Sequence, residues 1–435
     1  MAGKKQCFNF TQYNFTKTKN AYIPKTVYVS MNQYGANKCS PTIESGQIVK
    51  EGQVIGRGKG DNASIHSPVP GIVSGFSYLS MPYGKRSLAA VITMNGAFSF
   101  TGKTESISDW NLLSTTELIT LFKNRGIINT FYTKPVSLAA QCVDTVHTDK
   151  VLYVCLFDKQ PDIFVDSFIA NNYTKKIIVG AEIVAKALSA TKIVFFYSIE
   201  RGKITPRRFK KFLSASANAE FVQIDTTRYP RTVNSELRKA INKKFPDKKT
   251  EGSIEYNSFC IDCTTLYDVY NGIVLSKPLM ERLVQVTGTG LYRPRLLKVR
   301  IGTPIQNIVY ECGGSKKAPG KIIVNGLIQG IAISDITSPV TKFVKSITLL
   351  QKKELQFSSS SACIHCGRCH NVCPSGIHPA SLFASYVNNI KIPKEIHVTI
   401  NWCSECGLCN TVCPSRLPLV QTISLMKEEE NERCI

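Results

Sequence analysis

Two cysteine runs near the C-terminal end decide how this sequence is interpreted: CIHCGRCHNVCP, residues 363–374, and CSECGLCNTVCP, residues 403–414. Both have the spacing C-x2-C-x2-C-x3-C-P without deviation. Three thiolates two residues apart can wrap a tight loop around one face of a metal cluster, while the fourth, before a proline that redirects the chain, points away. Gly367 and Gly407 suit such loops, because glycine accepts tight turns and leaves backbone N–H groups free to bond sulfide.

This spacing is typical of bacterial two-cluster ferredoxins, in which the fourth cysteine of each run binds the neighbouring cluster. We therefore expect two [4Fe–4S] clusters with crossed ligands. The first cluster is assigned to Cys363, Cys366, Cys369 and Cys413, and the second to Cys403, Cys406, Cys409 and Cys373. The alternative is a pair of zinc knuckles, but zinc commonly takes its four ligands as two pairs, and runs of four cysteines with CP endings fit that poorly.

Each run already supplies four thiolates, so nearby histidines are not needed as ligands. They are interpreted as neighbours of the clusters: His365, His370 and His378. A separate pair, Cys260-x-x-Cys263, has the spacing of a thioredoxin-like motif or half a zinc site. No second pair lies near it in the sequence, so we interpret it as two incidental thiols.

Composition and charge narrow the class of protein. The 435 residues, 43% of them apolar, are typical of a globular chain with several domains, and sixteen cysteines in a cytosolic chain indicate metal rather than disulfides. We expect no membrane span, because the most apolar stretch, residues 177–199, carries charges, and no secretory signal. The net charge of +23 indicates either a lysine-rich solvated surface or attraction to something acidic.

The pattern along the chain predicts a multidomain α+β protein. In the first segment, residues 1–105, a polar and irregular stretch up to about residue 22 precedes short β-like runs with glycine turns from residue 25 to about 91. In the second segment, residues 106–255, helices alternate with strands from 110 to about 244, for example a helix capped at Thr115 or Ser114 and strands at 151–157 and 192–197, which predicts an α/β domain with a parallel sheet. In the third segment, residues 256–348, residues 277–340 return to β-like runs. The last segment, 349–435, begins with a serine-rich linker through residue 361, then has the cysteine runs and a helix beyond Pro418.

Beyond the cysteines, the order of short motifs resembles that of RnfC, the C subunit of the Rnf-type ion-translocating electron transport complex, across nearly the whole chain. The motifs that carry this resemblance are residues 23–25, 49–56 and 66–71 at the beginning, 277–282, 286–288, 299–304 and 311–314 in the third segment, 339–342 before the clusters, and 418–420 after them. The resemblance implies four domains in order. They are a barrel-sandwich domain, an NADH/FMN domain like the complex I flavoprotein subunit, a β-grasp (SLBB-like) domain and a double-cluster ferredoxin-type domain.

The first segment is also similar to lipoyl and biotinyl carriers, which present a lysine at a hairpin tip. Here the tip reads Asp61-Asn62-Ala63, with asparagine at the lysine position, so we expect no acyl group and a role in structure or docking.

The family's nucleotide-binding motifs are altered in this sequence. Its glycine-rich loop, roughly G-x-G-G-A-G-F-P, corresponds to GIINTFYTKP, residues 126–135, where two bulky aromatic residues replace the glycines that let a backbone approach phosphate. Its acidic motif, Glu-Cys-Glu-Pro, corresponds to residues 158–161, where one carboxylate is shortened and one neutralised. We expect NADH and FMN binding to be lost or much weakened. The degenerate site is assigned to Gly126, Asn129, Lys134, Asp158 and Gln160.

The resemblance implies an electron-relay subunit, peripheral on the cytoplasmic side of the inner membrane, that works with other subunits and needs no catalytic acid or base. The densest basic stretch, residues 201–211, has no nucleic-acid motif, so nucleic acid is not an expected partner. We hypothesise that it docks an acidic one-electron carrier, a flavodoxin or ferredoxin. Three alternatives stay open: an NADH dehydrogenase subunit that kept its flavin, a cobalamin-reductase-like flavoprotein, and a redox-silent scaffold.

Overall fold

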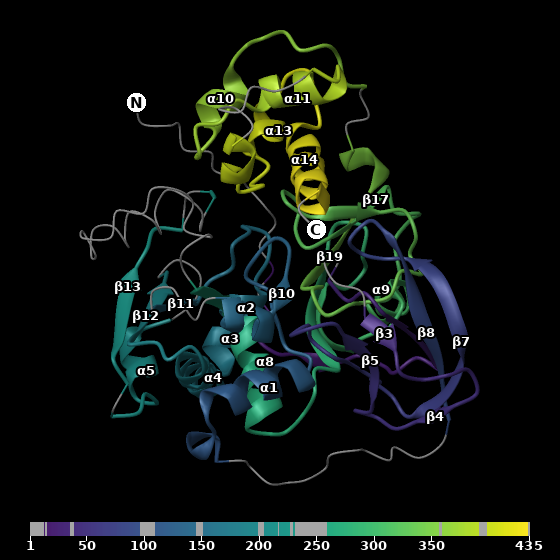
Figure 1. Ribbon diagram of the computed structural model, residues 1–435. Helices are drawn as coiled ribbons and strands as arrows, with labels where there is room; N and C mark the ends of the chain where they lie inside the picture. Colours follow the sequence, from purple (N-terminus) through teal and green to yellow (C-terminus); the bar gives the residue numbers. More distant parts are fainter. Residues whose placement is uncertain are drawn as a thin grey trace. The chain divides into compact units, whose positions relative to one another are not determined.

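The computed structural model describes residues 13, 15–34, 39–95, 109–144, 151–198, 204–215, 217–226, 229–230, 259–355, 359–390 and 398–433. The chain divides into two compact units. The larger unit comprises residues 10–223 and 258–355, and the cysteine unit comprises residues 1–9, 224–257 and 356–435 (Figure 1).

Two small antiparallel sheets form the N-terminal part of the larger unit, as the glycine-punctuated β-like runs predict. In sheet order they contain β2 (Thr26–Ser30), β8 (Arg86–Met94), β7 (Gly71–Ser80) and β4 (Ile48–Val49), then β3 (Cys39–Pro41), β5 (Val54–Gly58) and β6 (Ile65–His66). Their apolar side chains share one core, in which Val27, Ile55, Val73 and Ile92 are fully buried.

A four-stranded parallel sheet follows, which confirms the predicted α/β layer. Its order is β13 (Ala219–Gln223), β12 (Lys192–Tyr197), β11 (Val151–Cys155) and β14 (Phe259–Asp262). The helices gathered beside it in Figure 1 are α1 (Thr115–Asn124), α2 (Leu138–Asp144), α3 (Val165–Asn172), α4 (Thr174–Ala187), α5 (Pro206–Lys210) and α8 (Cys263–Ile273). The predicted cap of α1 is confirmed, because Ser114 accepts from the Glu117 N–H at 3.3 Å while Glu117 accepts from the Ser114 N–H at 2.7 Å. A short η1 helix (Trp110–Leu112) and a two-stranded β9 (Ile128–Asn129) and β10 (Val136–Ser137) pair complete this part.

A six-stranded mixed sheet completes the larger unit. Its order is β1 (Lys19–Asn20), β16 (Arg295–Arg300), β15 (Glu281–Thr287), β19 (Ser346–Leu350), β17 (Lys321–Val324) and β18 (Ile331–Ile333), with α9 (Ile305–Glu311) beside it and η2 (Lys352–Glu354) after it.

Three features of these sheets differ from the boundaries expected from the sequence. The residues of β1 pair with β16 rather than with the first sheets. Strand β14 and helix α8 belong with the parallel sheet. The linker expected from residue 349 begins later, because Leu349 lies in β19 opposite Ile322 and is fully buried.

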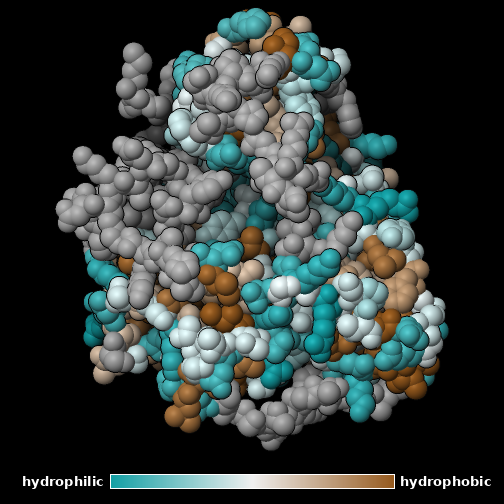
Figure 2. Space-filling view, in the orientation of Figure 1, coloured by the Kyte–Doolittle hydropathy of each residue, from teal (hydrophilic) through white to brown (hydrophobic). Residues whose placement is uncertain are grey.

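The cysteine unit is built from short helices: α10 (Arg368–Val372), α11 (Pro379–Val387), η3 (Val398–Trp402), α13 (Leu408–Val412) and α14 (Leu419–Arg433). The helix predicted beyond Pro418 is confirmed as α14, which packs on α11 through a small core that includes Leu382 and Ile423. Figure 2 shows hydrophilic and hydrophobic residues interspersed over one face of the molecule. Among the described residues, no helix is both long and apolar enough to cross a membrane.

Candidate functional site

The last cysteine of the first run lies with the second run. Cys403, Cys406 and Cys409 are buried, and Cys373 lines one small pocket together with them. Cys403 and Cys406 come from the loop before α13, Cys409 lies in α13 itself, and Cys373 directly follows α10, which packs against α13. The structure thus brings together the four thiols expected to hold the second cluster.

Three of the four remaining thiols pack in one apolar group, and the fourth, Cys366, does not belong to it. Cys363, Cys369 and Cys413 pack in one apolar group with Leu417 and Leu419, which Cys409 also joins. Cys369 is buried and Cys413 half-buried, whereas Cys366 is exposed. Cys413 of the second run therefore lies near two thiols of the first run, and the ligand set of the first cluster stays a prediction.

Both loops repeat one backbone geometry. The residue before the second cysteine has a left-handed conformation in each run, with φ of 52° at His365 and 53° at Glu405. The glycine after that cysteine is left-handed too, with φ of 68° at Gly367 and 76° at Gly407, and a helix starts at the next residue. The Glu405 N–H points at the Cys403 Sγ, 3.4 Å away, which is the kind of contact that stabilises a ligand thiolate.

The chemistry of this donor set fits iron–sulfur clusters. All fourteen cysteines among the described residues are free thiols, six of them the scattered buried ones and eight in the runs. A four-iron cube takes one thiolate per iron, and each of the two expected sets supplies four thiols. Burial raises the pKa of the Cys403 thiol to about 12, so its ligand form depends on a bound cation. His370 bonds the Ile377 carbonyl at 2.9 Å and stacks on His378.

A second candidate site lies in the larger unit, where the altered nucleotide motifs were expected. A pocket of about 110 Å³ lies between the ends of β11 and β17, and its lining includes Phe131, Lys159, Gln160 and Lys345. Phe131 is only 2% exposed. The Lys159 ammonium lies 4.4 Å from the centre of the Phe131 ring and donates to the Phe131 carbonyl. This lysine and this ring therefore occupy space at the mouth of the predicted site.

Two of the five residues assigned to that site line the pocket. Asp158 accepts from the N–H groups of Asp166 and Ser167, at 2.8 and 3.1 Å, which satisfies first-turn donors of α3. Gln160 donates to the Asn325 carbonyl at 2.6 Å. The Asp158 carboxyl and the Gln160 amide are thus both hydrogen-bonded within the protein.

The other three residues are placed differently. Asn129 is fully buried and donates to Gln141 and to the Cys260 carbonyl, at 2.8 Å each. Gly126 is left-handed, and a Cβ there would lie 2.3 Å from the Ser64 carbonyl oxygen, so its size serves a close approach between segments. Lys134 is exposed.

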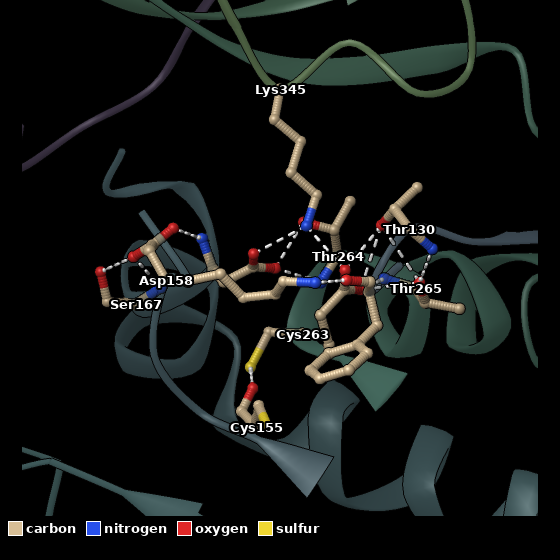
Figure 3. A network of polar contacts seen from close by, with 12 residues as sticks. Thr130, Cys155, Asp158, Ser167, Cys263, Thr264, Thr265 and Lys345 are labelled. Carbon is tan, nitrogen blue, oxygen red and sulfur yellow. Dashed lines mark hydrogen bonds and ion pairs between the residues drawn. The ribbon is translucent and has the colours of Figure 1, made fainter. Parts of the chain in front are cut away.

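Sequence reasoning missed the central group of this region, a buried ion-pair network (Figure 3). The Lys345 ammonium reaches two carboxylates, Asp166 and Asp262, at 2.7 Å each, and all three side chains are nearly inaccessible. Asp166 also accepts from the N–H and hydroxyl of Thr264. The one available signal was position, because Asp262 ends a buried strand, and the carboxyl ends of parallel strands are where polar groups converge.

Charge and burial act in opposite directions on these carboxyls. Burial raises the pKa of Asp166 to about 6, against the opposing charge of Lys345. Burial also disfavours the Asp262 anion, but Lys345 and hydrogen bonds from Thr265 outweigh it and lower the pKa of Asp262. The lysine stays protonated, because the two carboxylates overcome its own burial and raise its pKa. The two carboxylates therefore share one ammonium, and the network carries a net negative charge when both are ionised.

A second buried lysine joins three segments of the larger unit. Lys342 is 1% exposed, and its ammonium donates to the carbonyls of Ser64 and Gly126, at 2.6 and 2.7 Å. With no carboxylate bonded to it, burial lowers its pKa from 10.5 to about 7.

This lysine predicts a pH dependence of stability. The unfolded chain keeps the lysine protonated up to about pH 10, whereas the folded chain releases the proton near pH 7, so the free energy of unfolding rises between those values. Lys342→Met should abolish that rise. The midpoint of thermal unfolding at pH 6.5 and 9, measured anaerobically in both proteins, checks it, and an unchanged pH slope in the variant contradicts it.

Comparisons with known proteins agree with the two ends of this architecture. A model of the RnfC barrel sandwich hybrid domain matches residues 10–97, and a model of the 4Fe-4S dicluster domain matches residues 362–417. The chain is 28% identical over 379 residues to the C subunit of the ion-translocating oxidoreductase complex of Methanosarcina acetivorans, covering 83% of each chain.

Two further relatives align over a similar length. The C subunit of the Na⁺-translocating ferredoxin:NAD⁺ oxidoreductase complex of Acetobacterium woodii is 24% identical, over 82% of this chain and 81% of that one. The proton-translocating counterpart of Clostridium ljungdahlii is 25% identical, over 83% and 79%. Among solved structures, an air-oxidised NAD⁺-reducing [NiFe]-hydrogenase superposes with a TM-score of 0.48 at 12% identity, over 68% of this chain and 59% of that one.

Proposed function

We propose that this chain is the electron-relay subunit of an Rnf-type ion-translocating complex. The premise is that the chain is RnfC-like, with a barrel-sandwich domain at one end and a 4Fe-4S dicluster domain at the other. The observation that carries the proposal is the meeting of Cys373 with Cys403, Cys406 and Cys409 across the two runs. A relay needs two clusters held close together, and crossed ligation achieves that with one pair of packed loops.

The ligand sets proposed are those expected from the spacing. The first cluster is held by Cys363, Cys366, Cys369 and Cys413, and the second by Cys403, Cys406, Cys409 and Cys373. Each cluster, when bound, accepts and releases a single electron. The chain's own contribution is to supply the thiolates, to direct backbone N–H groups at them, and to exclude water with apolar side chains such as Ile377 and Ile423.

The domain roles between the two ends are also proposals. The parallel sheet and its helices support a domain derived from a nucleotide-binding one, over roughly residues 106–255 with β14 and α8 added. The mixed sheet with α9 supports a β-grasp domain over residues 256–348. We propose that the subunit sits peripherally on the cytoplasmic side of the membrane with other subunits of its complex, and receives electrons from an acidic flavodoxin or ferredoxin.

We further propose that NADH and FMN binding is lost or much weakened. Typical small-molecule sites have about 300–1,000 Å³, and the pocket here has about 110 Å³. The buried Phe131 ring and the Lys159 side chain over it take up the remaining room. The rival interpretations, a flavin-dependent NADH dehydrogenase or a cobalamin-reductase-like protein, require that both side chains move aside.

An anaerobic titration of the cluster-loaded protein tests this function. With FMN supplied, NADH should leave the visible cluster absorption unchanged, whereas dithionite should bleach it reversibly. Bleaching by stoichiometric NADH would show that the nucleotide site survives and would favour the flavoprotein interpretations. Clusters that neither reagent reduces would support a redox-silent scaffold instead.

A further inference from the structure

The two cysteine loops differ in how far solvent reaches them. In the second run, Cys403, Cys406 and Gly407 are all buried. The hydroxyl of Tyr229, which belongs to the same unit, donates to the Cys406 carbonyl at 2.8 Å and so lies against this loop. The second cluster would therefore be held under protein.

The first loop is open by comparison. Ile364, Cys366 and Gly367 are exposed, and Ile364 keeps 66% of its surface accessible although it is a large apolar residue. A single exposed apolar residue is ordinary on a protein surface, so the informative feature is the exposed ligand thiol beside it. The first cluster is thus the one that a partner can approach closely.

Two cations flank this opening. A groove of about 550 Å³ is lined by Arg368 and Arg416 and also by Cys413, a ligand assigned to the first cluster. Both arginines are exposed. Thr411 also lines the groove.

We propose that this surface, Ile364, Cys366, Arg368, Cys413 and Arg416, is the docking site of an acidic one-electron carrier protein, and that the first cluster is the one that exchanges electrons with it. The inference rests on the proposed relay function and specifies where the relay begins. One electron passes from the carrier, which is oxidised, to the cluster held by the first run, which is reduced by one, and no proton or covalent bond of this chain takes part.

The physical argument combines distance with charge. Electron transfer needs close approach, and only the first loop offers an exposed ligand. Two arginines beside it raise the local concentration of an acidic partner and orient it, which accelerates association at low ionic strength. The exposed Ile364 gives the short-range contact that charge alone does not supply.

This surface competes with the one suggested by sequence. Arg207, Arg208 and Lys210 of α5, with Lys211 after it, are exposed as the basic stretch predicts. However, α5 belongs to the larger unit, which contains neither cysteine run. A carrier bound at α5 therefore finds no cluster-ligand cysteine within the larger unit.

The test uses the cluster-loaded protein and reduced flavodoxin as the probe carrier. Stopped-flow absorbance gives the second-order rate of cluster reduction, and isothermal titration with oxidised flavodoxin gives the affinity. The double variant Arg368→Gln, Arg416→Gln should lower the rate and the affinity about tenfold at low ionic strength. This difference from the wild type should vanish near 0.5 M salt, because the Debye length there is on the order of 4 Å and the charges are screened. Thr411→Lys should raise both, an effect that damage to the domain does not produce.

The matched control is Arg207→Gln with Arg208→Gln, which removes the same charge from α5. It should leave rate and affinity within about twofold of the wild type. A loss in this control alone, or equal values in all variants, would overturn the proposal. Reduction by dithionite distinguishes failure of the relay from failure of the docking site. If dithionite cannot reduce the clusters, the relay function itself is refuted. If dithionite reduces them normally but the arginine variants have no effect, only the docking site is refuted.

Discussion

Replacing Cys373 is expected to destroy the cluster of the other run, not the cluster of its own. In the structure Cys373 lines a pocket with Cys403, Cys406 and Cys409, whereas Cys413 packs with the thiols of the first run. A site left with three thiolates loses one iron contact and becomes labile, because each thiolate holds its own iron. Cys373→Ala should therefore weaken the second cluster and spare the first.

Double variants decide this without ambiguity. If ligation is crossed, Cys373→Ala combined with Cys406→Ala strikes one cluster twice, so the protein keeps one intact cluster and about half of its iron and sulfide. Cys373→Ala combined with Cys366→Ala strikes both clusters and should leave neither intact. If each run held its own cluster, the two double variants would exchange behaviour.

The measurement is iron and acid-labile sulfide per chain, together with the electron paramagnetic resonance spectrum after dithionite reduction. A conservative control is Ser375→Ala, close to Cys373 in the chain and lining the same pocket but supplying no thiol. It should retain both clusters. Full iron in the Cys373→Ala, Cys406→Ala protein would mean that the eight cysteines are not the ligand set.

Local signals predicted several of the elements correctly. The reciprocal hydrogen bonds between Ser114 and Glu117, a capping box, fix the start of α1. The buried apolar run 192–197 coincides with β12. These features depend on neighbours within a few residues, which a single sequence displays. The parallel order of the sheet followed from the alternation of strands and helices.

Long-range pairings left no such signal. The pairing of β1 with β16 joins residues that are far apart in the sequence, and two-residue strands have no periodicity to detect. Helix α9 is seven residues long, within a stretch that otherwise has a β-like pattern. In the site, the aromatic filling by Phe131 was visible in the sequence, but the matching position of Lys159 over its ring depends on the fold.

The buried network was the least predictable part, because Lys345 looks like an ordinary charged residue at the start of a strand. Only the fold brings it against Asp166 and Asp262, from segments far apart in the chain. Its side chain is 12% exposed, and those of the two aspartates are 6% and 3% exposed. Burying these three charges is costly unless all are paired, so the pairing is a condition of the fold at this point.

Lys345→Met is expected to reduce the free energy of unfolding by about 3–5 kcal/mol at neutral pH, because it leaves two buried carboxylates without their cation. The matched control is Lys298→Met, which breaks the half-exposed pair with Glu281. That pair is solvated, so its loss should cost less than about 1 kcal/mol. Equilibrium urea unfolding of both variants, followed anaerobically by circular dichroism at pH 7.5, gives the comparison.

Acidity should rescue the variant, and the sign follows from the carboxyls. Burial already raises the pKa of Asp166 to about 6 with Lys345 present, and removing the lysine's charge raises it further. A carboxyl whose pKa is higher in the folded chain than in the unfolded chain binds more protons when folded, so the variant gains stability as the pH falls through that value. The deficit relative to wild type should therefore shrink between pH 7.5 and 5.5. Adding Asp166→Asn to Lys345→Met should recover part of the lost free energy of unfolding at pH 7.5, since it removes one unpaired charge. If the loss of stability changes neither with pH nor on adding Asp166→Asn, Lys345 acts through packing alone.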